Sequence, residues 1–308
     1  MRNYSIDTLK LICAIFVIFI HTPQPEVWSK YITPLMRCAV PIFFMISGYF
    51  SYGKKNLADT IHKRIIEQIK IFSWGFILYF IIHLIMGWKV QCNVPYTLLF
   101  NFIPNNYAHL WYILAYIYVL IVMLFVDKYN LYKILFCCVP ILLIVALSIG
   151  AYSEILIGRS FALIYTRNWL LTGLPFFALG MMIKLIERPL MSYIPILISI
   201  VVFYIMGLFE ITYLQLGNGD YYISTIFLSI SIFLLFINVK QSNDNLFSRV
   251  GRKDSLYIYI LHFFIAAIIT KYNLQYPHLA YVSTLITLCL TLSFIALLKK
   301  IKCIGTII

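Results

Sequence analysis

Apolar residues occur along the chain in long runs that are separated by short polar segments. Ten of these runs have the length of about 17 to 25 residues that a helix needs to cross a bilayer. They lie at residues 5–23, 35–52, 65–87, 109–126, 133–151, 169–186, 193–210, 222–239, 255–272 and 279–298. The pattern predicts an all-α polytopic membrane protein with about ten transmembrane helices, forming one integral membrane domain over residues 1–308.

Lysine and arginine residues fall unevenly between the two sides of such a protein. With a cytoplasmic N-terminus, the outer side receives only Lys30, Arg37, Lys89, Arg159, Arg167 and Lys271. Most other basic residues lie on the inner side, as the positive-inside rule requires for an even number of spans. We therefore expect both termini to be cytoplasmic. The first run continues into Thr22 and Pro23 without a small-residue cleavage site, which predicts a retained helix and no cleaved signal.

The composition agrees with a membrane protein and excludes several other classes. Of 308 residues, 62% are hydrophobic and only 11% are charged, whereas soluble domains carry roughly 25% charged residues. The net charge of +13 follows from the sidedness of the loops, which are too short for a nucleic-acid surface. The seven cysteines show no C-x-x-C spacing, so the sequence predicts neither a metal site nor a disulfide framework.

Two polar residues mark the ends of the first apolar run. Lys10 and His21 are eleven residues apart, about 16 Å along one helix. A charge within hydrocarbon needs a partner or a function. Taken singly, however, Lys10 could extend to the interface, and His21 could be an ordinary interfacial histidine. Isolated polar residues in other runs have the same two interpretations.

Several short segments resemble, in order, those of the acyltransferase-3 family of integral membrane acyltransferases. The segment "IDTLKLICAIFVIFIH" is similar to the family's first helix, with an aspartate, a basic residue, ten intervening residues and a histidine. "MRCAVPIFFMISGYF" and "HKRII" resemble its second and third spans. "HLWYILAYIYVL", "LPFFALGMMI" and "SLYIYILHFFI" resemble later helices. The resemblance covers essentially the whole chain and is to the stand-alone O-acyltransferase type.

The resemblance implies a membrane O-acyltransferase. Such an enzyme moves an acyl group, commonly acetyl, from cytoplasmic acyl-CoA to a hydroxyl of a cell-envelope carbohydrate or lipid-linked sugar. It implies a multi-pass protein of the inner (cytoplasmic) membrane, with acyl-CoA as co-substrate, no permanently bound cofactor and no nucleic-acid partner. His21 would be catalytic, either as a general base or as an acyl-accepting nucleophile. Lys10, Lys63 and Arg64 would bind the donor phosphates.

Other assignments stay open at this stage. An acceptor-contacting role and a structural role are both open for Arg37, His109, Trp111 and His262. The chain departs from the family where Lys10 stands in place of a common arginine and where Glu67 follows Lys63 and Arg64. A small transporter or lipid-linked sugar flippase is the alternative function, with His21, Arg37 and Glu210 handling protons. A non-catalytic membrane scaffold is a third possibility.

Overall fold

The computed structural model describes residues 3–85, 87, 97, 101, 105–186, 192–216, 219–239, 241–273 and 275–300. The predicted outer-side residue Lys89 lies outside this set. Every regular element among the described residues is helical. The elements are α1 (Tyr4–His21), α2 (Glu26–Met36), α3 (Ala39–Tyr49), α4 (Leu57–Ile85), η1 (Asn105–Leu110), α6 (Trp111–Lys128), α7 (Tyr132–Ile149), α8 (Ser153–Ile157), η2 (Leu163–Tyr165), η3 (Trp169–Gly173), α9 (Leu174–Leu185), α10 (Tyr193–Thr212), α11 (Ile223–Asn238), α12 (Leu246–Lys253), α13 (Ser255–Asn273), η4 (Pro277–Tyr281) and α14 (Ser283–Lys300).

The helices confirm the prediction of a polytopic all-α membrane protein. Among the described residues, eight helical segments are long and apolar enough to cross a bilayer. Two shorter apolar helical segments, Trp169–Leu185 and Ile223–Asn238, coincide with two further predicted runs. Each of the ten predicted runs therefore corresponds to a helical segment. The exact number of spans and the cytoplasmic location of both termini stay predictions.

Two helix boundaries differ from the predicted ones. The second segment begins at Glu26, nine residues before the predicted start at 35, and is broken between α2 and α3 at Arg37 and Cys38. The third begins at Leu57 and not at residue 65. Its first turns carry exposed polar residues such as His62 and Lys63. An apolar run locates the hydrocarbon part of a helix but misses a polar extension that continues it into water.

The chain divides into two compact units. The first comprises Met1–Phe43, Arg188–Gly217 and Tyr221–Thr306, and the second comprises Phe44–Glu187, Asn218–Asp220 and Ile307–Ile308. Helix α3 contributes residues to both. The prediction of one domain over residues 1–308 stays a prediction.

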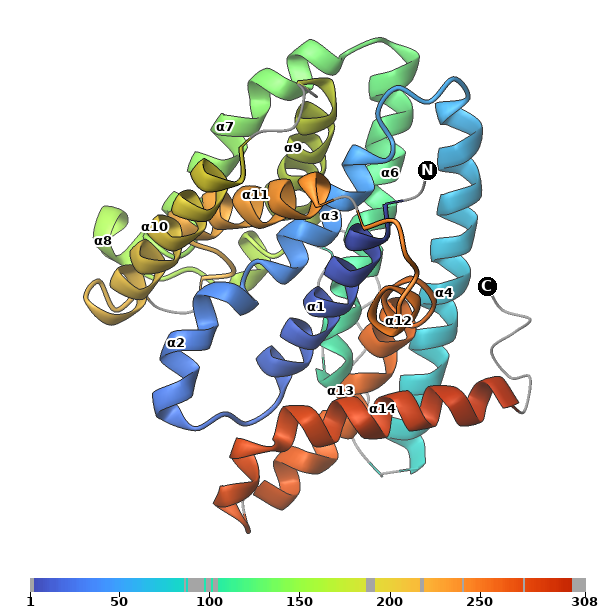
Figure 1. The fold of residues 1–308 in the computed structure, drawn as a ribbon, viewed down its shortest axis with the longest axis vertical. Coiled ribbons are helices and arrows are strands. Elements are labelled where there is room, and N and C mark those ends of the chain that lie inside the picture. Colours follow the sequence, from blue (N-terminus) through green and yellow to red (C-terminus); the bar gives the residue numbers. More distant parts are fainter. Residues whose placement is uncertain are drawn as a thin grey trace. The chain divides into compact units, whose positions relative to one another are not determined.

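In the first unit, helix α1 packs against α2, α11, α12, α13 and α14. Figure 1 shows α1 in dark blue beside the orange and red C-terminal helices. The side chain of Asn3 accepts a hydrogen bond from the Ser5 amide at 3.1 Å and so caps α1. It also donates to the Ile237 carbonyl at the end of α11, at 3.2 Å. The start of α1 is thereby attached to a helix more than 230 residues later in the chain.

In the second unit, helices α3 and α9 approach each other through two glycines. A Cβ atom on Gly48 would lie 1.9 Å from the Phe177 carbonyl oxygen, and one on Gly180 would lie 2.1 Å from the Met45 oxygen. Any larger residue at either position would separate the two backbones. Gly48 and Gly180 thus permit close helix approach, as small residues do in membranes.

Candidate active site

Helix α1 carries both Lys10 and His21 without interruption. Because α1 runs from Tyr4 to His21, the predicted separation of about 16 Å along one helix holds. One long face of α1 is buried, including Leu9, Cys13 and Val17. Lys10 and His21 are only partly buried. Helix α1 therefore holds the side chains of Lys10 and His21 at two fixed positions along its length.

The His21 side chain lies beside that of His262 from α13. The centroids of the two imidazole rings are 5.3 Å apart, and their planes are tilted by 41°. The Phe263 ring packs edge-on against His21 at 4.9 Å. His262 is completely buried. The structure thus brings together two predicted site residues that are 241 positions apart in the sequence.

A layer of small polar side chains fixes the chain directly after His21. Thr22 Oγ1 and Thr284 Oγ1 are 2.9 Å apart, and Gln24 Nε2 donates to both hydroxyl oxygens at 2.9 and 2.8 Å. Ser283 Oγ donates to the Pro23 carbonyl at 2.6 Å. These bonds attach the end of α1 to the start of α14. Helix α13 therefore contacts the His21 ring, and α14 holds the residues that directly follow His21.

At the other end of α1, Lys10 forms an ion pair within its own helix. Lys10 Nζ lies 3.2 Å from Asp7 Oδ1, and Asp7 is buried whereas Lys10 is partly exposed. Helix α12 covers this end of α1, because a Cβ on Gly251 would lie only 1.8 Å from the Asp7 carbonyl oxygen. The Arg252 guanidinium lies 5.7 Å from the centroid of the Tyr4 ring. One cation of α12, Arg252, therefore lies at the same end of α1 as Lys10, which the sequence motifs did not indicate.

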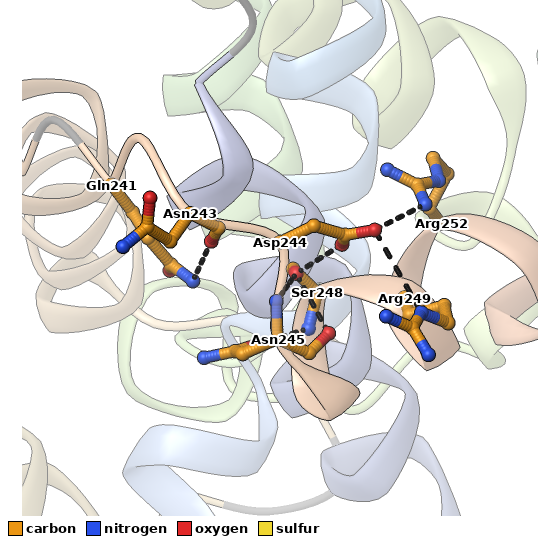
Figure 2. A network of polar contacts seen from close by, with 7 residues as sticks. All are labelled: Gln241, Asn243, Asp244, Asn245, Ser248, Arg249 and Arg252. Atoms are coloured by element: carbon orange, nitrogen blue, oxygen red, sulfur yellow. Dashed lines mark hydrogen bonds and ion pairs between the residues drawn. The ribbon is translucent and has the colours of Figure 1, made fainter.

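Helix α12 and the loop before it form a polar network (Figure 2). Asp244 accepts from Arg252 Nη2 and from Ser248 Oγ, both at 2.9 Å, and lies 3.7 Å from Arg249 Nε. The hydrogen bonds from Arg252 and Ser248 hold the pKa of Asp244 below its usual value. The bond to Asp244 raises the pKa of Arg252. Asn245 caps the helix by accepting from the Ser248 amide at 2.9 Å.

Lys63 and Arg64 lie in the second unit, at the start of α4. Lys63 is exposed, and Arg64 Nη1 donates to Ser51 Oγ at 2.8 Å. Partial burial, together with the nearby Arg64 charge, lowers the pKa of Lys54. Lys54 was not among the predicted site residues. Lys54 and Arg64 are thus two cations close enough to affect each other at the start of α4.

His109 and Trp111 also belong to the second unit, and both are buried. The His109 ring packs edge-on against Tyr79 at 4.9 Å, and Asn101 Nδ2 donates to the Trp111 carbonyl at 2.8 Å. Arg37 is partly buried at the C-terminal cap of α2, and its amide donates to the Thr33 carbonyl at 3.1 Å. These contacts involve the His109 ring but only the main chain of Trp111 and Arg37.

Glu210 has a clear structural role in the first unit. It is buried near the end of α10 and accepts a hydrogen bond from the Ser224 hydroxyl. Its carboxylate oxygens are both 3.3 Å from the Ser224 amide in the first turn of α11. A carboxylate in this position stabilises a helix N-terminus. Among the described residues, no group of three or more His, Cys, Asp or Glu side chains could hold a metal ion.

Comparison with known proteins identifies one family across nearly the whole chain. A family model described as an acyltransferase domain matches residues 3–298. An amino-acid racemase of Enterococcus faecalis is 28% identical over 123 residues, which are 36% of this chain and 18% of the racemase. A serine/alanine racemase of Enterococcus gallinarum is 30% identical over 125 residues, again 36% and 18%. The chain thus covers less than a fifth of either racemase. No solved structure matches it.

Proposed function

Because this chain belongs to the acyltransferase-3 family and is a membrane acyltransferase, we propose that it is an O-acyltransferase acting on the cell envelope. The donor is cytoplasmic acyl-CoA, most simply acetyl-CoA. The acceptor is a hydroxyl of an envelope carbohydrate or of a lipid-linked sugar. The protein would reside in the cytoplasmic membrane, with the His21 end of α1 toward the outer side.

One observation carries this proposal. At one end of α1, the His21 ring contacts the ring of a second histidine. Lys10 lies about 16 Å from His21 along α1, at the end of α1 that the basic helix α12 covers. A polyanionic nucleotide is attracted to cations, and acyl transfer to a hydroxyl needs a group that accepts a proton. The donor thioester is carried on a long, flexible arm, which would let it reach His21 while the nucleotide stays at Lys10.

The chemistry at His21 can proceed in two ways. As a general base, the imidazole takes the proton of the acceptor hydroxyl while the oxygen attacks the thioester carbonyl. The C–S bond then breaks, and the proton passes to the departing CoA thiolate. As a nucleophile, the imidazole attacks the thioester carbonyl, the C–S bond breaks and CoA leaves as the thiolate. The acceptor oxygen then takes the acyl group as the bond between acyl carbon and imidazole nitrogen breaks, and the hydroxyl proton passes through the freed imidazole to the thiolate. Lys10, Lys63, Arg64 and Lys54 are the candidates for holding the donor phosphates.

The transporter alternative finds less support in the described residues. It assigned proton coupling to His21, Arg37 and Glu210. Glu210, however, is used to stabilise the start of α11 through Ser224. The racemase names concern proteins of which this chain covers only 18%, so racemisation is not proposed.

The test uses the full-length protein in inside-out membrane vesicles supplied with acetyl-CoA that is radiolabelled in the acetyl group. We expect label to enter an envelope glycan with the native chain. His21→Gln should reduce incorporation by about 10²- to 10⁴-fold, the usual contribution of a positioned acid or base. Its binding of acetyl-CoA should remain unchanged, because His21 lies at the opposite end of α1 from Lys10.

Two results would overturn the proposal. One is near-normal incorporation by His21→Gln, since glutamine can hydrogen bond but cannot exchange protons near neutral pH. The other is uptake of an intact sugar or amino acid without any acyl transfer, which would favour the transporter. His83 is a buried histidine of the second unit. The His83→Gln protein is the matched control and should remain active.

A further inference from the structure

His262 has no assigned role, although its ring packs directly against that of His21. The ring centroids are 5.3 Å apart. His262 is completely buried in α13, whereas His21 is only partly buried. A buried imidazole beside a reacting one is well placed to control that group's orientation and proton affinity, as the histidine-orienting partners of other active sites do.

The hydrogen bond at one ring nitrogen fixes the chemistry of the other. His262 Nδ1 lies 2.9 Å from the Ile258 carbonyl oxygen, one turn earlier in α13. A carbonyl oxygen can only accept a hydrogen bond, so Nδ1 must carry the proton. In the neutral imidazole the second nitrogen, Nε2, then carries a lone pair and is an acceptor. The helix backbone thus prepares His262 to receive a proton or a hydrogen bond at Nε2.

We propose that His262 is a positioning residue that accepts, at Nε2, the N–H of the His21 imidazole during acyl transfer. This inference rests on the proposed function, because it needs a reacting His21. When His21 takes the acceptor's proton at one nitrogen, it becomes an imidazolium with N–H groups on both nitrogens. His262 Nε2 stabilises the second N–H.

The proton balance closes without a further reactant. The acceptor hydroxyl loses its proton to His21, the acyl ester forms, and the C–S bond of the donor breaks. The proton then moves from His21 to the CoA thiolate. His262 returns to its original state, with its proton on Nδ1 throughout. If His21 is the nucleophile, the same contact would stabilise the N–H of the positively charged acyl-imidazolium.

The test compares two substitutions at His262 in the native and the His21→Gln proteins. His262→Leu removes the acceptor but retains an apolar side chain. His262→Gln supplies an amide oxygen that can accept a hydrogen bond. We expect His262→Leu to lower kcat by about ten- to a hundredfold, as loss of a histidine-orienting partner does elsewhere, with the Kd for acetyl-CoA unchanged. His262→Gln should recover a substantial part of kcat.

The double mutant distinguishes positioning from packing. If His262 acts through His21, adding His262→Leu to His21→Gln should cause no further loss. His83 is a suitable control, because it is also buried and its Nδ1 lies 3.1 Å from the carbonyl of Tyr79, four residues earlier. His83→Leu should not lower kcat.

The results separate failure of this inference from failure of the proposed function. Normal kcat in His262→Leu alongside an inactive His21→Gln would overturn only the role of His262. Equal kcat losses in His262→Leu and His262→Gln, or a further loss in the double mutant, would also overturn it. An active His21→Gln protein would overturn the proposed function itself.

Discussion

The contact between α1 and α12 predicts an unusual response to a small substitution. Alanine at position 251 would place its Cβ 1.8 Å from the Asp7 carbonyl oxygen and 3.1 Å from the Leu11 nitrogen. Carbon–oxygen contacts in proteins are normally no shorter than about 3.3 Å. The two helix backbones would have to separate by about 1.5 Å, since 3.3 minus 1.8 is 1.5. No side-chain rotation can relieve the clash, because both atoms nearest to the added methyl belong to backbone.

Helix propensity and packing give opposite signs for this substitution. In an isolated helix, Gly251→Ala would be stabilising by about 0.8–1.0 kcal/mol. Overpacking of a close contact typically costs about 1–3 kcal/mol, and a backbone obstacle places this case at the upper end. We therefore expect a net loss of about 2 kcal/mol, since about 3 minus about 1 is about 2.

Thiol exposure provides the assay, because Cys13 of α1 and Cys38 are both buried in the first unit. A thiol-reactive dye would report the exposure of Cys13 and Cys38 as the detergent-purified protein is heated, after the other five cysteines, Cys92, Cys137, Cys138, Cys289 and Cys303, are replaced by serine. Gly251→Ala should lower the unfolding temperature, whereas Lys253→Ala, an exposed substitution in the same helix, should not. An unchanged or raised unfolding temperature for Gly251→Ala would refute the close contact between α1 and α12.

Three further predictions concern charge and topology. Asp244→Asn should lower the stability of the protein in low salt, because it weakens the bonds to Arg252 and Ser248 in α12. Because the pKa of Asp244 is lowered in the folded protein, its contribution to stability should be complete above about pH 3.9 and disappear as the pH falls through the lower folded pKa. Unfolding measured against pH in the native and Asp244→Asn proteins checks this, and identical stability profiles would contradict it. Lys54→Ala and Arg64→Ala should each weaken acetyl-CoA binding, more at low ionic strength, as titration with the nucleotide would show; unchanged Kd values would remove both residues from the donor site. A cysteine placed at exposed Asn243 should react with an impermeant thiol reagent only after cells are opened, and strong labelling of intact cells would place this loop outside.

The parts of the fold that depend on local pattern could be predicted from the sequence. Each apolar run corresponds to a helical segment because burial in lipid requires a continuous apolar stretch whose backbone groups are satisfied within it. The spacing of Lys10 and His21 is likewise local. One helix, α1, fixes it whatever the other helices do.

The contacts that complete the site could not be predicted in this way. His262 meets His21 because α13 packs against α1, and a single sequence contains no signal for that pairing. Gly251 is one of 13 glycines, and nothing nearby in the sequence distinguishes it as a close-contact position. Lys54 and its neighbour Lys55 precede α4 in a short loop. The electrostatic coupling of Lys54 to Arg64 depends on how α3 and α4 are joined.

The ion pair at Lys10 changes how the donor end of the site should be understood. Because Asp7 is buried and 3.2 Å from Lys10, it offsets much of the charge that a donor phosphate would experience from this lysine. Lys10 alone is therefore a weak anion site. Arg252 is held over Tyr4 at the same end of α1, where it adds a guanidinium, which can form two parallel hydrogen bonds with a phosphate. Arg252 is itself paired with Asp244 at 2.9 Å, so a donor phosphate at this end of α1 would have to compete with a carboxylate for either cation.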